Sequence, residues 1–359
     1  MNDLDAKTFN DIATVLKKSI LEWFGPGAYL DPSRNPQVRS FAHSFIARYI
    51  VSGSESQTLL VKIAHKANQS DLQFAINNDA LRALARREMH QLQATWQAFK
   101  ELNDPDLIAV QPLAYLEPWN AIVMVEVQAQ SLKSILASPK IGLGFPKASE
   151  QFIQHLQKAS KWLRHFHDHV GGSQMGAASR ILMQARLDKV SRDVNDHMGT
   201  RFDTPKKISS IKLQIDNVSG LEPVAQMHGD FHCSNILVTP RGQICVLDPR
   251  ADSSRKSVYN DLATLLIDLH VKPIPMLTSG KFAKTFLAQS RQAIMESYFK
   301  AGESSKSLLD FYCACEVIYK WSMDERDFIN SKKMRMVAPL IHSIHSRYMS
   351  QLISQFLTN

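Results

Sequence analysis

Two aspartates and an asparagine lie within residues 227–248, where the chain is predicted to form a β-hairpin. The segment reads Met-His-Gly-Asp-Phe-His-Cys-Ser-Asn-Ile-Leu-Val-Thr-Pro-Arg-Gly-Gln-Ile-Cys-Val-Leu-Asp. Two short apolar runs, Ile236–Val238 and Ile244–Leu247, flank a stretch rich in turn-forming residues. We therefore predict two antiparallel strands joined by a loop at Pro240–Gln243.

The pairing expected for this hairpin brings oxygen-bearing side chains together at its open end. A four-residue loop makes Thr239 the partner of Ile244 and, counting outward, Asn235 the partner of Asp248. Directly paired residues have Cβ atoms roughly 5 Å apart, and amide and carboxylate oxygens are suitable ligands for Mg²⁺. Asp230 precedes Asn235 by a short loop that returns it to the same end. The segment thus predicts one metal site with a spare carboxylate beside it, which is a candidate reacting centre.

Lys62 and Glu88 are charged residues at positions where apolar side chains are expected. Lys62 lies inside Leu59–Ala64, a run otherwise suited to a buried strand, and Glu88 shares the apolar stripe of a helix with Leu84 and Leu92. Burying one charge alone costs on the order of several kcal/mol, and burying the two against each other lowers that cost. We expect the two side chains to meet, with the ammonium group able to contact a phosphate. The alternative is a lysine that leans to the surface and a glutamate at the edge of the stripe.

The hydrophobic pattern divides the chain into a first part with strands around one long helix and a second part that is mostly helical. An amphipathic N-terminal helix is expected to end at Gly25-Pro26-Gly27. Strands are predicted at residues 37–41, 45–51, 58–64, 107–116 and 121–127, with one helix at 79–102. Later helices are predicted at residues 150–169, 178–198, 259–270, 282–300, 308–322 and 337–357.

This order of elements predicts an α+β fold with two lobes. We expect an N-lobe at residues 1–125, with a small antiparallel sheet and one main helix, and a hinge at 126–130. A mostly helical C-lobe follows at residues 131–359 and contains the hairpin. Clefts between lobes are preferred sites for small molecules.

The composition is that of an ordinary globular protein with an excess of positive charge. Of 359 residues, 44% are hydrophobic and 21% are charged, and the formal net charge is +8. The charge favours anionic partners such as nucleotides, acidic small molecules or a membrane surface. The alternative is a basic surface that is only solvated. The sequence has no run of lysine and arginine interleaved with aromatic residues, so we expect no nucleic-acid partner.

Several features favour a cytoplasmic location. The N-terminal residues Met-Asn-Asp-Leu-Asp do not start a secretory signal, and the apolar stretches are too short to span a membrane. The four cysteines fit neither a zinc site nor a disulfide framework, so a reducing cytosol is expected. Lys332, Lys333 and Arg335 precede an apolar-faced C-terminal segment. We expect a helix packed on the C-lobe there, in preference to a helix on a membrane surface.

The segment His228-Gly229-Asp230-x-x-x-x-Asn235, followed by an apolar strand that ends in Asp248, resembles the signature of the aminoglycoside phosphotransferase/choline kinase family. Tyr259-Asn260-Asp261-Leu262-Ala263 resembles the helix start that follows the metal-binding segment in that family. A lone His-Gly-Asp is weak evidence. The whole set also follows the family's order: Lys62, Glu88, linker, Asp230, Asn235, Asp248, Asp261. The resemblance implies a bilobal protein-kinase-like fold and a small-molecule kinase.

The resemblance also implies a role for each residue of this set. Asp230 would orient the acceptor hydroxyl group and accept its proton. Asn235 and Asp248 would hold Mg²⁺ on the phosphates of ATP, with GTP as the alternative nucleotide. Lys62 would contact the α- and β-phosphates and be held in place by Glu88. Such an enzyme works by positioning and charge neutralisation, without a covalent intermediate. We name two segments by residue range: the catalytic loop, 228–235, and the metal-binding hairpin, 235–248.

Other residues receive supporting roles from the same resemblance. Backbone groups of the linker would meet the purine edge, at Glu126, Val127 and Gln128. His228 would brace the catalytic loop by hydrogen bonding. Asp261 would cap backbone N–H groups at a helix start and steady the catalytic loop.

The loop expected to cover the phosphates departs from the usual pattern. The segment at residues 39–45 contains no glycine, although such loops usually need glycine for close backbone approach. Ser40, His43 and Ser44 would then supply hydrogen-bond donors, and the alternative is weaker nucleotide binding. That alternative favours a second function, a catalytically idle nucleotide-binding pseudokinase scaffold. A protein kinase is a third candidate, and it is less favoured because Asp248-Pro249 replaces Asp-Phe-Gly.

Basic residues follow Asp248 and are expected to line the acceptor side of the cleft. They are Arg250, Arg255 and Lys256. Enzymes that phosphorylate polycationic aminoglycosides need acidic acceptor pockets. A basic protein with Arg250 next to the metal therefore favours a neutral or anionic hydroxyl compound, such as a sugar, a sugar derivative or a hydroxy acid. The alternative is that these residues are only solvated near the cleft.

Overall fold

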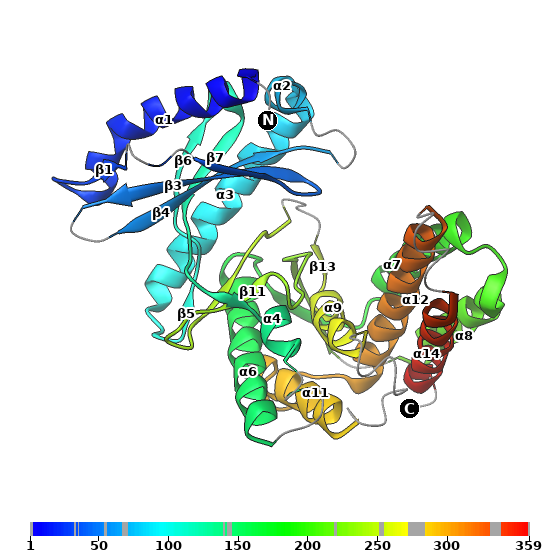
Figure 1. Ribbon diagram of the computed structural model, residues 1–359. Helices are drawn as coiled ribbons and strands as arrows, with labels where there is room; N and C mark the ends of the chain where they lie inside the picture. The colour runs from blue at the N-terminus through cyan, green and yellow to red at the C-terminus, as the bar shows by residue number, and fades with distance from the viewer. Residues whose placement is uncertain are drawn as a thin grey trace. The chain divides into compact units, whose positions relative to one another are not determined.

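The chain forms two compact units, Met1–Ala129 and Gln130–Asn359 (Figure 1). The computed structural model describes residues 3–31, 34, 36–53, 56–66, 71–138, 141, 146–218, 221–250, 255–271, 284–330 and 339–357. The hinge expected at residues 126–130 includes the boundary between the units, and its role stays a prediction.

The first unit is an antiparallel sheet with three helices. Its elements are α1 (Asp3–Phe24), β1 (Tyr29–Leu30), β2 (Gln37–Ser40), β3 (Ser44–Ser52), β4 (Gln57–Ala64), α2 (Leu72–Asn77), α3 (Asp79–Leu102), β5 (Leu107–Ile108), β6 (Pro112–Leu116), η1 (Glu117–Trp119) and β7 (Ala121–Val125). The strand order is β1-β3-β4-β7-β6, and β2 also pairs with β3. Every one of these pairings is antiparallel.

The N-terminal helix α1 covers part of this sheet and fills its core. It lies against β1 and β3 (Figure 1). Its apolar stripe is at most 1% exposed, at Phe9, Ile12, Leu16 and Ile20. The helix ends at Phe24, where Gly25 adopts a positive φ and its N–H bonds to the Leu21 carbonyl. The amphipathic N-terminal helix predicted from periodicity is confirmed.

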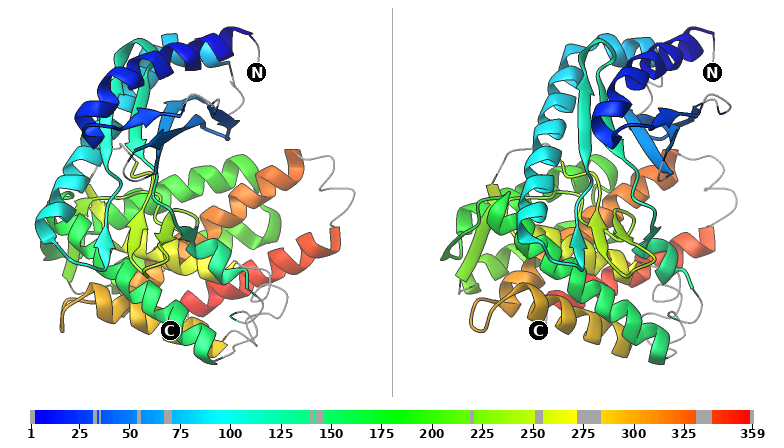
Figure 2. Two further views of the ribbon diagram at one scale, coloured as in Figure 1. Left: turned by 60° about the vertical axis from the view of Figure 1, so that its left-hand side comes forward. Right: turned by 90° about the vertical axis from the view of Figure 1, so that its left-hand side faces the viewer.

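The second unit is mostly helical. Its elements are β8 (Gln130–Ser131), α4 (Leu132–Leu136), α6 (Pro146–His169), β9 (Gln174–Ala177), α7 (Arg180–His197), η2 (Arg201–Asp203), α8 (Thr204–Asn217), β10 (Leu221–Gln226), β11 (Ile236–Val238), β12 (Ile244–Val246), β13 (Arg255–Ser257), α9 (Tyr259–His270), α11 (Lys284–Tyr298), α12 (Lys306–Asn330) and α14 (Pro339–Leu357). Helix α12 packs against α7, α9 and α14, and Figure 2 shows α12 and α14 side by side.

Three short strands form a separate sheet in the second unit, which the sequence pattern did not predict. Strand β10 pairs on one side with β9 and on the other with β13. The buried carboxylate of Glu222 in β10 accepts hydrogen bonds from the Ser179 N–H, at 2.6 Å, and from the Tyr312 hydroxyl, at 2.7 Å. Helix α8 was also missed because it buries only Thr204, Ile211 and Ile215, too few to give a clear helical period.

The predicted β-hairpin is present, but its register differs by one residue from the expected one. Val238 pairs with Ile244, and the Thr239 N–H bonds to the Gln243 carbonyl. The loop therefore has three residues, because the N–H of Gly242 bonds to the Thr239 carbonyl and Gly242 adopts φ +77°. This is the usual geometry of a tight turn followed by a left-handed glycine. Asn235 therefore lies opposite Leu247, and the predicted direct pairing of Asn235 with Asp248 is wrong.

Two further observations bear on the sequence-based expectations about location. Within the residues described, no helix combines the length and the apolar character that crossing a membrane requires. All four cysteines are buried and free, at Cys233, Cys245, Cys313 and Cys315. The basic residues expected to precede the last helix, Lys332, Lys333 and Arg335, lie outside the described residues.

Replacing Gly242 by alanine is expected to destabilise the second unit by about 1 kcal/mol, because a side chain disfavours a left-handed backbone. A Cβ at residue 242 would meet only the flexible end of Lys158, so backbone strain alone is tested. The matched control is Gly176→Ala, at a position with open space and no positive φ, and it is expected to be neutral or slightly stabilising. Urea unfolding measures both changes, and equal stability of the two variants would contradict the loop geometry.

Candidate active site

Lys62 and Glu88 form an ion pair in the first unit. Lys62 on β4 lies between Ile46 of β3 and Ile122 of β7 in the sheet. Its Nζ is 2.8 Å from Oε1 of Glu88 on α3, and the two side chains are 14% and 10% exposed. Mutual neutralisation is what makes burial of both charges tolerable. The prediction that the two side chains meet is confirmed.

The glycine-free segment between β2 and β3 is a tight hairpin turn. The Phe41 N–H bonds to the Ser44 carbonyl, and Ala42 and His43 form a two-residue loop. Neither loop residue adopts a positive φ, so the turn has no need of glycine. Ser44 begins β3 and its backbone pairs with Ala64.

The linker residues lie at the end of β7 and are held by side-chain and backbone contacts. The Glu126 N–H bonds to the Thr58 carbonyl at 2.8 Å. The Glu126 carboxylate pairs with Arg48 at 2.5 Å and accepts a hydrogen bond from Gln128 at 3.1 Å. The backbone N–H of Glu126 is thus engaged within the sheet. The predicted contact of residues 126–128 with the purine edge then depends on the Glu126 carbonyl and on the backbone groups of Val127 and Gln128.

In the second unit, the carboxylate of Asp261 fixes the start of the catalytic loop. Asp261 is buried in the first turn of α9. Its Oδ2 accepts the His228 N–H at 2.8 Å, and its Oδ1 accepts the Gly229 N–H at 2.9 Å. His167 donates from Nε2 to Oδ2 at 3.1 Å, and its Nδ1 is hydrogen-bonded to the Tyr298 hydroxyl at 2.7 Å. The expected capping of its own helix by Asp261 is wrong, because the carboxylate faces the loop.

Further backbone contacts hold the rest of the catalytic loop. Asp268, two turns after Asp261 on α9, accepts the Cys233 N–H at 3.1 Å. The Cys233 carbonyl accepts the Lys133 N–H, and the His228 carbonyl accepts the Arg250 N–H. Gly229 has φ +80°, and a Cβ there would lie 3.1 Å from the Cβ of Arg250. The backbone of the loop is therefore held in one conformation, and residue 229 must be glycine to adopt it.

The ring of His228 is packed among aromatic side chains. Its centroid lies 5.7 to 6.0 Å from those of Trp162, Phe166 and Phe231. Among the described residues, neither ring nitrogen has a hydrogen-bond partner. Burial lowers the pKa of His228 to about 4, so the ring is neutral near pH 7. His228 does brace the loop by hydrogen bonding, as expected, but through its backbone N–H and carbonyl, and its ring contributes packing.

Asp230 carries the carboxylate of this loop, and its side chain is 33% exposed. Its Oδ2 accepts a hydrogen bond from Asn235 Nδ2 at 3.0 Å and lies 3.5 Å from His232 Nε2. Its Oδ1 lies 3.4 Å from the guanidinium of Arg250. Burial alone would raise the pKa of Asp230. The hydrogen bond from His232 and, after it, the charge of Arg250 outweigh burial and lower this pKa to about 2. Asp230 is thus ionised at any physiological pH.

Asn235 and Asp248, the residues expected to hold a metal ion, carry oxygen atoms at the open end of the hairpin. The Asn235 carbonyl accepts the Leu247 N–H at 2.8 Å, which places Asp248 one residue beyond the direct pair. Asp248 adopts φ +54°, a rare conformation for a residue with a side chain, at the point where the chain leaves β12. The Asn235 amide nitrogen is bound to Asp230, so its Oδ1 is the atom suited to a cation.

This donor set fits Mg²⁺ in the way that phosphate-binding enzymes use it. Mg²⁺ keeps water and phosphate oxygens and takes only one or two protein groups. Within the described ranges, no group of three or more His, Cys, Asp or Glu side chains is arranged to hold a metal ion. The set of Asn235 and Asp248 contains one amide and one carboxylate, so it is smaller than such a group and agrees with the one or two protein ligands that Mg²⁺ takes.

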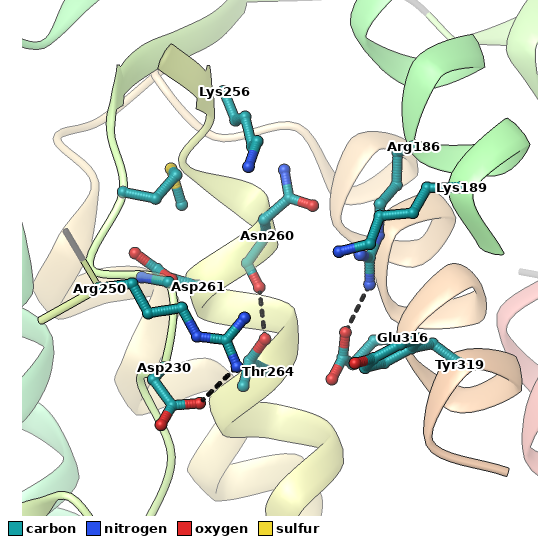
Figure 3. A pocket seen from close by; sticks show the side chains of 12 residues that line it. Arg186, Lys189, Asp230, Arg250, Lys256, Asn260, Asp261, Thr264, Glu316 and Tyr319 are labelled. Carbon is teal, nitrogen blue, oxygen red and sulfur yellow. Dashed lines mark hydrogen bonds and ion pairs between the residues drawn. The ribbon is translucent and has the colours of Figure 1, made fainter. Parts of the chain in front are cut away.

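A cavity of about 140 Å³ opens beside Asp230 within the second unit (Figure 3). The predicted residues Arg250 and Lys256 line it. Arg255 does not, because its guanidinium donates to the carbonyls of Gly172 and Val224. The expectation that Arg255 lines the acceptor side is therefore not supported by the geometry.

Several side chains at this site escaped sequence reasoning. Arg186 and Lys189 of α7 and Glu316 and Tyr319 of α12 also line the cavity. Arg186 and Lys189 lie among other charged residues of α7, so their types gave no signal. Asp268 and Glu316 did carry a signal, because each is an acid inside an otherwise apolar run, the same anomaly that marked Lys62.

Replacing His228 by phenylalanine is expected to reduce the loss of stability in acid. The unfolded chain protonates this histidine near pH 6.5, whereas the folded protein does so only near pH 4. Between these values the unfolded state binds the extra proton, so stability falls as pH falls, by about 1.4 kcal/mol per pH unit per proton. His228→Phe has no such proton to bind, so its free energy of unfolding should fall less steeply than that of the wild type between pH 6.5 and 4. Urea unfolding at several pH values measures the difference. A slope unchanged from wild type, and equal to that of the exposed-site control His43→Phe, would contradict burial of a neutral ring.

Comparison with known proteins identifies the family of the chain. The family model described as the phosphotransferase enzyme family matches residues 37–298, well over half of the chain. No protein among those of curated function matches the sequence.

Solved structures show the same fold at low sequence identity. A Ralstonia eutropha protein assigned as an aminoglycoside phosphotransferase aligns with a TM-score of 0.55 and 9% identity, over 99% of this chain and 98% of that chain. The choline kinase LicA from Streptococcus pneumoniae aligns with a TM-score of 0.50 and 10% identity, over 96% and 99%. These structures confirm the predicted α+β, protein-kinase-like fold, and the family model confirms the predicted phosphotransferase class. The protein is a member of the phosphotransferase enzyme family.

Proposed function

We propose that this protein transfers the γ-phosphoryl group of ATP to a hydroxyl group of a small molecule, in a reaction that requires Mg²⁺. The observation that supports this most is the placement of Asp230. Its carboxylate lines a cavity, is ionised, and is carried by a loop whose backbone is fixed by buried carboxylates. Phosphoryl transfer needs positioning and charge neutralisation more than covalent chemistry, and a rigid loop meets that need.

In this proposal Asp230 orients the acceptor hydroxyl group through a hydrogen bond. A carboxylate with a pKa of about 2 is a weak base. It therefore takes the proton late, as the bond from the acceptor oxygen to phosphorus forms and the bond from that phosphorus to the ADP oxygen breaks. The hydrogen bonds from Asn235 and the nearby Arg250 hold the carboxylate in one orientation.

The nucleotide and the metal ion are assigned to other residues of the set. Asn235 and Asp248 hold Mg²⁺, which neutralises phosphate charge. Lys62 contacts the α- and β-phosphates, and its ion pair with Glu88 sets the position of its ammonium group. The linker at residues 126–128 and Ser44 of the β2–β3 hairpin complete the nucleotide contacts. The tight glycine-free turn removes the main reason to favour an idle scaffold, since no residue in it requires glycine.

The acceptor is a neutral or anionic hydroxyl compound, and a polycationic aminoglycoside is disfavoured. Basic side chains line the cavity beside Asp230, and they would repel a polycation. We retain the cytosol as the proposed location, because four buried free thiols suit a reducing compartment.

Replacing Asp230 by asparagine is expected to lower turnover by at least about 10²-fold, the scale on which a positioned base contributes. Asparagine keeps the size of the side chain and the loop contacts, so ATP binding and the melting temperature should remain near the wild-type values. The measurement is ADP release over a library of hydroxyl compounds. The control is Asp216→Asn, which changes an aspartate on α8 whose side chain is 74% exposed. Full activity of Asp230→Asn would refute the assigned role.

A further inference from the structure

We propose that the cavity beside Asp230 contains an anion subsite formed by Lys189 and Lys256, so that the acceptor carries a carboxylate or phosphate group as well as the reacting hydroxyl. The proposal rests on the proposed function and narrows its substrate class. It depends on residues of the second unit only, since every residue that lines this cavity belongs to that unit.

The two lysines approach the cavity from different elements. Lys256 belongs to β13 and Lys189 to α7. Figure 3 shows their ammonium groups pointing into the same space, with the amide of Asn260 between them and Asp230 at the far end. A ligand in this cavity therefore meets a carboxylate suited to a hydroxyl group at one end and two ammonium groups at the other.

The acids in the cavity wall have partners that hold them in place. Glu316 accepts a hydrogen bond from Arg186 at 2.5 Å. Asp261 accepts the backbone N–H groups of the catalytic loop, as described above, and Asp230 lies beside Arg250. These contacts turn each carboxylate toward an arginine or the backbone.

The charge around Lys189 is predominantly positive. Burial lowers the pKa of Lys189, and the like charges of Arg186, Lys256 and Arg250 lower it further, while Asp193 one turn along α7 opposes them. The ammonium group also lies 5.7 Å from the centroid of the Tyr319 ring. The lining carries four cationic side chains against the carboxylates of Asp230, Asp261 and Glu316, an excess of one positive charge. The like charges lie close to Lys189, so an anionic ligand between Lys189 and Lys256 would reduce their mutual repulsion.

The size of the cavity suits a small polar substituent. Its volume of about 140 Å³ exceeds that of a single water molecule several-fold. A carboxylate or phosphate group fits such a space and can accept hydrogen bonds from both ammonium groups and from a neutral amide donor.

The test compares related acceptors that carry a neutral, an anionic or a cationic substituent. One series is glucose, glucuronate, glucose 6-phosphate and glucosamine, and the other is glycerol, glycerate, glycerol 3-phosphate and 2-amino-1,3-propanediol. ADP release by the full-length protein gives kcat/KM for each compound. The anionic members should exceed the neutral member of the same series at least ten-fold, with the cationic member lowest.

Substitution of each lysine tests whether the subsite causes the preference for anionic acceptors. Lys189→Ala and Lys256→Ala should each lower the ratio of kcat/KM for anionic to neutral acceptors at least ten-fold. Lys189→Arg should retain most of the ratio, and Lys189→Glu should shift the preference toward the cationic member. The matched control is Lys212→Ala, which removes an exposed lysine of α8 and should leave the ratio unchanged. Melting temperatures show whether each variant is folded.

The outcomes separate the subsite from the proposed function. Turnover that is highest with neutral or cationic acceptors would overturn the subsite and leave the kinase function intact. Absence of turnover, with anionic compounds still raising the melting temperature of the wild type but not of Lys189→Glu, would support the subsite and refute the function. If the lysines bind nucleotide phosphate instead, both alanine variants would raise KM for ATP equally with every acceptor. That result would also overturn the proposal.

Discussion

The buried carboxylate of Asp261 determines the geometry of the candidate active site. It accepts the backbone N–H groups of His228 and Gly229 at 2.8 and 2.9 Å, and so fixes the point where the catalytic loop begins. Inside a protein such charge-assisted hydrogen bonds are strong, and leaving their donors unsatisfied is costly. The contact from Asp268 to the Cys233 N–H then fixes the middle of the loop. Between these two points the chain has little freedom.

The reactive groups depend on that fixed loop. Asp230 and Asn235 are joined by a hydrogen bond of 3.0 Å, so the carboxylate proposed for the acceptor and the amide proposed for the metal are held together. Asp248 lies one residue beyond the pair of Asn235 with Leu247, and Arg250 contacts both the His228 carbonyl and the Asp230 carboxylate. In the other unit, Lys62 and Glu88 form a similar pair of charges that would be unstable in isolation. Each half of the proposed chemistry therefore uses buried charge that is stabilised locally.

The site residues that could be predicted from the sequence are charged residues at positions where the hydrophobic pattern requires an apolar side chain. Lys62 in a buried strand and Glu88 on an apolar stripe had to compensate each other, and α3 and α9 have the predicted bounds. The hairpin register failed because it depends on whether Gly242 takes a left-handed conformation, which composition alone does not determine. The sequence did not predict that the His228 ring packs among aromatic side chains, because that packing depends on tertiary structure. Lys189 and Glu316 come from distant helices that only the fold brings to the cavity.

Amide hydrogen exchange at His228 and Gly229 tests whether Asp261 holds the backbone of the catalytic loop. We expect both amides to exchange as slowly as those in the buried part of α9. In Asp261→Asn both should exchange much faster and ADP formation should fall with them. Exchange at these two amides in the wild type as fast as in an exposed loop would contradict the account.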